Sequence, residues 1–141
     1  MNTKDNKSII QFTNPELVES IFIDNPNYDG QLDIHQNMKI TSAHDKVFFN
    51  GKNKRSSTVS LTVSNFNQID FSTNRPFFLR ITMKAKFTWY SGLNDKEEEN
   101  FLKVNAASLL LSYIRPHVYS ITALSRFTEQ NIPFIDFTSQ I

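Results

Sequence analysis

The stretch PFFLRITMKAKFTWY, residues 76–90, decides the fold class. Apolar and polar side chains alternate along it without a break, and this period of two is typical of a β-strand and not of a helix. One side of the strand carries Phe77, Leu79, Ile81, Met83, Ala85, Phe87 and Trp89. The other side carries Phe78, Arg80, Thr82, Lys84, Lys86, Thr88 and Tyr90. The pattern predicts an antiparallel sheet with one face in the core and the other in water.

Three stretches upstream carry further strand patterns. PELVESIFID (15–24) is a strand followed by NPNYDG (25–30), which has the composition of a turn. LDIHQNMKIT (32–41) alternates, and STVSLTVSNF (57–66) alternates again. The side chains expected to face inward from these two stretches are Leu32, Ile34, Met38, Ile40, Val59, Leu61 and Val63.

The period changes to a helical one after SGLNDKEEEN (91–100), whose acidic residues suit a helix N-terminus. From Asn105 to about Arg126 the apolar residues form two stripes. The first stripe is Ala106, Leu110, Tyr113 and Leu124, and the second is Ala107, Leu111, Ile114, Val118 and Ile121. Two stripes need two covers, so we expect the first cover to be the chain's own sheet and the second to be the same helix of another copy. Pro116 is expected to kink or split this helix.

Composition restricts the chemistry of the chain. Its 141 residues indicate one domain, and the absence of cysteine excludes disulfides and cysteine-ligated zinc. The three glycines lie far apart, which excludes a glycine-rich phosphate loop, and the three histidines lack metal-ligand spacing. A net charge of +1 does not favour nucleic acid. We therefore expect no catalytic residue, no metal and no cofactor, and a binding or assembly function.

The order of these pieces resembles the SecB export-chaperone family. The stretches that carry the resemblance are FIDNPN (22–27), STVSLTVS (57–64), PFFLRITMKAKFTW (76–89), NAASLLLSYIRPHVYSITALSRF (105–127) and NIPFIDF (131–137). The family fold is α+β, with a four-stranded antiparallel sheet and a long C-terminal helix on one face. The resemblance implies that a flexible tail, residues 1–11, precedes a single SecB-like domain, residues 12–141, and that helices form the interface of a dimer of dimers.

The activity that the resemblance implies is that of a holdase, not an enzyme. Such chaperones bind unfolded or precursor polypeptides in nonpolar grooves, keep them soluble or translocation-competent, and pass them to the SecA motor. The location would be the bacterial cytoplasm, without membrane insertion, because the sequence has no apolar run of transmembrane length and no secretory signal.

Site residues follow from the resemblance by position. Client binding is implied for Tyr28, Leu32, Leu124, Phe127, Ile132, Phe134, Ile135 and Phe137, and ordinary core packing is the alternative for each. The second helix stripe becomes the oligomer interface, namely Ala107, Leu111, Ile114, Val118 and Ile121. Glu19 and Asp24 are the expected contacts with SecA.

The sequence also departs from the family pattern. Family members are acidic on the sheet, whereas Ser20 and Arg80 stand here where acidic residues would be expected, and the sequence ends at Ile141 without a final helix and SecA-docking tail. A SecB-like chaperone dedicated to the antitoxin of a toxin–antitoxin pair therefore stays open as an alternative. So do a single-partner adaptor protein and a small α+β enzyme.

Overall fold

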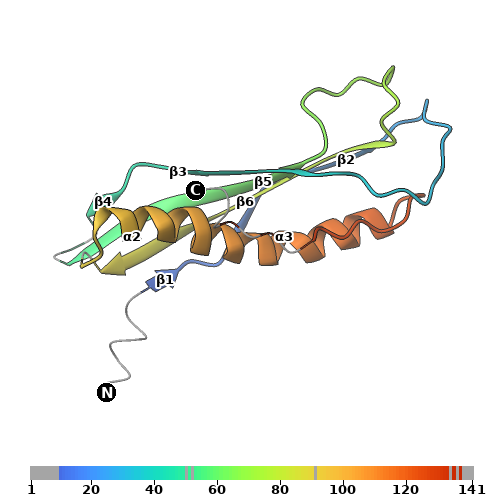
Figure 1. The fold of residues 1–141 in the computed structure, drawn as a ribbon. Coiled ribbons are helices and arrows are strands. Elements are labelled where there is room, and N and C mark those ends of the chain that lie inside the picture. Colours follow the sequence, from blue (N-terminus) through green and yellow to red (C-terminus); the bar gives the residue numbers. More distant parts are fainter. Residues whose placement is uncertain are drawn as a thin grey trace.

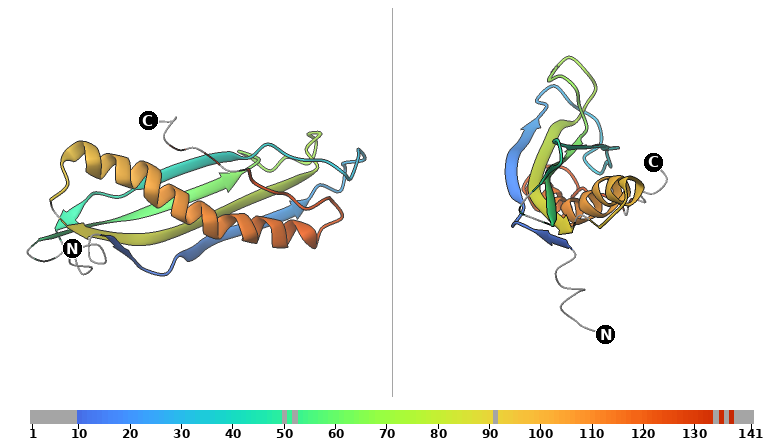
Figure 2. Two further views of the ribbon diagram at one scale, coloured as in Figure 1. Left: turned by 60° about the horizontal axis from the view of Figure 1, so that its bottom comes forward. Right: turned by 90° about the vertical axis from the view of Figure 1, so that its left-hand side faces the viewer.

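One antiparallel sheet and one long helix lying across it form the described part of the chain (Figure 1). The computed structural model describes residues 10–49, 51, 53–90, 92–133, 135 and 137. The helix runs obliquely over one face of the sheet, and the opposite face carries no helix (Figure 2). The predicted α+β class and the helix on one face are confirmed.

Within the described residues the sheet has six strands, and not the four that the resemblance implied. They are β1 (Ile10–Phe12), β2 (Glu16–Asp24), β3 (Lys39–His44), β4 (Phe48–Phe49), β5 (Lys54–Ser64) and β6 (Phe77–Tyr90). Strands β5 and β6 pair in the centre, β1 and β2 both pair with β6, and β3 and β4 both pair with β5. The short strands β1 and β4 thus lie in line with β2 and β3, respectively, along the two edges of the sheet. The break between β1 and β2 includes Pro15, which has no N–H to donate to the ladder.

The predicted core face of β6 is confirmed. Its odd-numbered residues from Phe77 to Trp89 are buried except Met83, which is half-buried. Val59, Leu61 and Val63 of β5 lie beside them in register and are fully buried. Helix α3 (Ala106–Ala123) packs on these two strands.

Phe78 is a correction, because it was expected on the wet face of β6 and is fully buried. The loop between β5 and β6 folds over that end of the sheet. Phe66 and Phe71 of the loop meet the Phe78 ring edge-on, with centroid distances of 5.4 and 5.6 Å. A small second apolar cluster therefore lies on the otherwise polar face.

The predicted strand at 32–41 is also wrong over most of its length, because β3 begins only at Lys39. The side chain of Gln130 occupies the place of a strand neighbour along 34–36. Its Oε1 accepts from the N–H of Gln36 at 2.9 Å, and its Nε2 donates to the carbonyl of Ile34 at 2.8 Å. The inward residues of the pattern still pack on the core, apart from Leu32, which is exposed.

The helix begins earlier than its apolar stripes and contains a π-helical turn. It consists of α2 (Asp95–Asn100), η1 (Phe101–Asn105) and α3 (Ala106–Ala123), and Asn94 with Glu97 forms a capping box at its start. The N–H of Ala106 donates to the carbonyl of Phe101, a step of five residues. This step keeps Phe101 and Ala106 on the same buried side of the helix.

Pro116 does not split the helix, since α3 continues from Ala106 to Ala123. The proline ring lies on the exposed side of the helix. Within the described residues, no helix has the length and apolar character required to cross a membrane.

Candidate functional site

The second stripe of the helix is covered by the chain itself. Ala107, Leu111, Ile114 and Val118 are buried in the single chain, and Ile121 is half-buried. The segment after α3 turns back along the helix (Figure 2). In the single chain, the sheet and the returning segment therefore cover much of this stripe, and its role as an oligomer interface stays a prediction.

The returning segment holds most of the residues expected to bind client. Phe127, Ile132 and Phe137 are buried in the core, and Ile135 is half-buried against it. Leu32 and Leu124 are exposed, Leu124 by 89%. Phe134 lies outside the described residues. Tyr28 is buried beside Phe127, with their ring centroids 5.7 Å apart.

Tyr28 and Phe127 belong to an aromatic chain that reaches the sheet. The ring of Phe127 lies 5.3 Å from that of Phe77, which stacks on Phe22 at 5.2 Å. The hydroxyl of Tyr28 donates to the carbonyl of Gln31 at 2.8 Å. Burial makes these two predicted client residues part of the structure that fixes the end of α3, and their contact with a client stays a prediction.

The two acids expected to contact SecA each lie beside an arginine, on opposite faces of the sheet. Arg126 Nε donates to Asp24 Oδ1 at 2.8 Å on the helix side. Glu19 Oε1 lies 3.8 Å from Arg80 Nε on the other side and accepts from the hydroxyl of Thr82 at 3.3 Å. The two carboxylates therefore do not form one acidic patch.

A groove follows the exposed side of α3 next to the returning segment. Two hollows of about 410 and 80 Å³ make up this groove and share Ser112 and Arg115 as lining residues. The helix contributes Ser108, Leu111, Ser112, Arg115, Pro116, Tyr119 and Ser120, and the segment contributes Asn131, Ile132, Ile135 and Phe137. We call this the α3 groove.

The lining of the α3 groove suits an extended polypeptide. Leu111, Ile132, Ile135 and Phe137 supply apolar surface, and the serine hydroxyls can accept hydrogen bonds from a peptide backbone. Tyr119 is 45% exposed at the rim. Arg115 Nε donates to the carbonyl of Ile132 at 2.9 Å and so ties the two walls together.

Sequence reasoning missed Ser112, Arg115, Pro116 and Tyr119. Their signal was present as helical spacing, because positions 112, 115, 116 and 119 lie on one side of an α-helix. These four residues combine a hydroxyl, a charge and two rings, so this side of the helix has no apolar pattern and resembles an ordinary solvent-exposed face. Only the returning segment makes this side into a groove.

The acidic run at the helix start contains Glu98, a buried carboxylate paired with the half-buried Arg55. Glu98 accepts from Arg55 Nε at 2.7 Å, from Arg55 Nη2 at 3.0 Å and from Trp89 Nε1 at 2.8 Å. Burial alone would raise the pKa of Glu98, but the hydrogen bonds from Arg55 and Trp89 outweigh it and the pKa is lowered. These hydrogen bonds join the helix start to β5 and β6, so the group acts as a structural clamp. Among the described residues, no group of His, Asp or Glu side chains could hold a metal ion.

Comparison with known proteins gives a match at the level of structure. No protein-family model matches the sequence. No curated protein matches it either. A solved SecB-like chaperone from Mycobacterium tuberculosis, Rv1957 in complex with a ChAD peptide from the HigA1 antitoxin, superposes with a TM-score of 0.63 at 11% identity, over 94% of this chain and 92% of that one. A protein of unknown function from Streptococcus agalactiae gives a TM-score of 0.55 at 12% identity, over 89% of this chain and 97% of that one. The expected resemblance is thus confirmed for the fold, which is SecB-like and divergent in sequence.

Proposed function

We propose that this chain is a chaperone that binds an extended, unfolded segment of another polypeptide, and that its client is one dedicated protein of the antitoxin type. The α3 groove is the observation that carries the proposal. It is open along its length, and it combines buried apolar side chains with hydroxyls, as a peptide of varied sequence requires. The mycobacterial chaperone with the same fold, which was solved with an antitoxin peptide, supports the same reading.

A general holdase that keeps precursors translocation-competent is the second candidate. Two exposed leucines, Leu32 and Leu124, favour it, because they add apolar surface outside the α3 groove that does not depend on client sequence. A holder that binds the unfolded state and not the native state acts by mass action, so either candidate needs no catalytic group. Delivery to SecA is the weaker part of this candidate, since Glu19 and Asp24 are separated by the sheet.

We further propose that the chain forms homo-oligomers in a bacterial cytoplasm. Two exposed tyrosines on α3, Tyr113 and Tyr119, and the exposed Leu124 provide apolar surface for another copy. Several subunits would hold one client through several weak contacts. Light scattering after gel filtration tests this part, and a strictly monomeric mass would contradict it.

Aggregation assays separate the two candidates. A stoichiometric amount of the chain should keep one aggregation-prone protein soluble, most directly a product of a neighbouring toxin–antitoxin gene pair, and should not protect a panel of unrelated unfolded proteins. Protection of the whole panel would favour the general holdase. Failure to protect any of these proteins would contradict the proposed function.

A further inference from the structure

The face of the sheet opposite α3 is polar and carries a concentration of cations. Its central strand β5 presents only hydroxyls between residues 56 and 64, namely Ser56, Thr58, Ser60, Thr62 and Ser64. Strand β6 presents Arg80, Lys84 and Lys86 beside them. Strand β2 adds two carboxylates to this face, Glu16 at 3.9 Å from Lys84 and Glu19 at 3.8 Å from Arg80. Cations still outnumber these acids, although the chain as a whole has a net charge of only +1.

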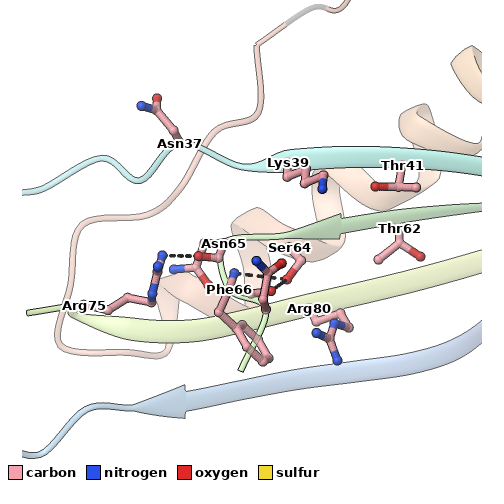
Figure 3. A pocket seen from close by; sticks show the side chains of 10 residues that line it. Asn37, Lys39, Thr41, Thr62, Ser64, Asn65, Phe66, Arg75 and Arg80 are labelled. Carbon is pink, nitrogen blue, oxygen red and sulfur yellow. Dashed lines mark hydrogen bonds between the residues drawn. The ribbon is translucent and has the colours of Figure 1, made fainter. Parts of the chain in front are cut away.

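Three cations, Lys39, Arg75 and Arg80, surround one hollow of about 320 Å³ at the β5–β6 loop end of this face (Figure 3). Lys39 of β3 pairs with Ser64 of β5, and Ser64 pairs with Arg80 of β6, so the three residues form one row across the sheet. Because neighbouring strands lie about 5 Å apart, the Lys39 and Arg80 backbones flank a gap of about 10 Å with a serine between them. Arg75 enters the same hollow from the loop.

The positive charge in this hollow is poorly compensated. Of the described residues that line it, none carries a carboxylate. Among the described residues, Lys39 and Arg75 take part in no ion pair, and Arg80 reaches Glu19 only at 3.8 Å. By contrast, Arg126 and Arg55 bind their carboxylates at 2.8 and 2.7 Å. Three cations around one hollow repel one another, and an anionic group between them would relieve this.

The lining favours carboxylates over a nucleic acid. Binding of single-stranded nucleic acid depends on exposed aromatic rings on which bases stack. Phe66, the one aromatic residue among the described residues that line the hollow, is buried, and the guanidinium of Arg80 covers its ring at 4.5 Å. Stacking on Phe66 holds the planar Arg80 fork in place, and such a fork matches a carboxylate in two-pronged geometry.

An extended segment is the form of ligand that fits the surroundings. Among the described residues, β3 pairs only with β5, so its outer edge offers backbone groups beside Lys39 and Thr41. A strand added at this edge would direct every second side chain over the polar face. Acidic side chains at those positions would approach the hollow.

We propose that this hollow is a docking site for an acidic peptide segment of a partner protein, held by Lys39, Arg75 and Arg80. The site is separate from the α3 groove and does not depend on the proposed client. It gives the chain a second polypeptide-binding surface on the opposite side of the sheet.

Fluorescence anisotropy with a labelled glutamate-rich peptide tests the site, and the glutamine analogue of the same length is the control. The glutamate peptide should bind, and its affinity should fall with added salt. Lys39→Glu, an exposed position in no ion pair, should weaken binding about fivefold or more. Arg75→Gln, a second variant, should weaken it as well, whereas Lys103→Gln on the helix side should leave it unchanged.

Three results would overturn the assignment. They are equal binding of the glutamine analogue, unchanged binding by a folded Lys39→Glu variant, and stronger competition by single-stranded DNA or inorganic phosphate than by free glutamate peptide. Blocking the α3 groove by Ser112→Arg should not affect this peptide. A failure of the proposed function is therefore distinguishable from a failure of this site.

Discussion

The guanidinium of Arg126 lies 2.8 Å from the carboxylate of Asp24 and joins the chain just after α3 to the end of β2, 102 residues earlier. Arg126 also donates to the backbone carbonyls of Asn25 and Tyr28, both at 3.2 Å, and its charge lies 4.8 Å from the ring centre of Phe127. One side chain therefore fixes the point where the chain turns back to form the second wall of the α3 groove.

Arg126→Ala should destabilise the chain more than Asp24→Asn. Loss of the arginine removes all its hydrogen bonds and the contact with Phe127, so we expect a cost of about 1–3 kcal/mol in the free energy of unfolding. Asp24→Asn weakens one half-exposed pair and should cost under about 1 kcal/mol. Urea unfolding followed by circular dichroism measures both, and equal costs would mean that Arg126 acts through Asp24 alone.

Gln130→Leu should cost about 2–4 kcal/mol, because it leaves the N–H of Gln36 and the carbonyl of Ile34 without their partner. The side chain is buried, and its own N–H donates to the hydroxyl of Thr122 at 2.9 Å. Glu129→Leu, at the adjacent half-buried position, is the matched control and should change stability little. Faster hydrogen exchange at 34–36 in Gln130→Leu would locate the effect, and unchanged exchange there would contradict it.

Stability should fall in acid because of Glu98. Its pKa is lowered in the folded state relative to the ordinary value of 4.5, so its stabilising contribution is present above about that pH. The contribution is lost as the pH falls through the lower, folded-state pKa. Glu98→Gln should cost about 2–3 kcal/mol at neutral pH and make the melting temperature less dependent on pH.

Trp89, the only tryptophan, donates to Glu98 and reports the transition by its fluorescence. The experiment is a series of thermal melts between pH 7 and pH 3 for the wild type and for Glu98→Gln. Parallel curves for the two proteins would show that other carboxylates cause the acid sensitivity.

Leu111→Glu or Ile114→Glu should unfold the chain and not merely dissociate an oligomer. Each substitution places an unpaired charge in the hydrophobic core of the single chain. Tyr113→Glu changes an exposed position of the same helix and should leave the fold intact. Sedimentation with circular dichroism separates the cases. If the Ile114→Glu variant were a folded monomer, the result would instead support the oligomer interface that the sequence predicted.

The sheet was predictable because alternation is a local property. The register of β5 with β6 follows from two regular apolar faces. The capping box depends on Asn94 and Glu97, which are only three positions apart in the sequence. The stretch 32–38 failed because its hydrogen bonds go to the side chain of Gln130, far away in sequence, and a period-two pattern carries no sign of that.

The candidate site was less predictable for the same reason. The two stripes on the helix correctly indicated two covers, but no pattern told whether the second was another copy or the chain's own returning segment. The buried Glu98 also depends on a partner far away in sequence, Arg55. Ser112 and Tyr119 can be recognised as groove residues only once the structure shows Ile132 lining the same hollow.

The central claim is that unfolded polypeptide binds in the α3 groove, and Ser112→Arg tests it most directly. Ser112 is exposed and lines both hollows of the groove, whereas Asn105 is exposed on the same helix and lines neither. The measurement is the affinity of a permanently unfolded test polypeptide and of the aggregation-prone client for the wild type, Ser112→Arg and Asn105→Arg. We expect Ser112→Arg to weaken binding about tenfold or more, equivalent to about 1.4 kcal/mol, with Asn105→Arg unchanged. Undiminished binding by a folded Ser112→Arg variant would contradict the account.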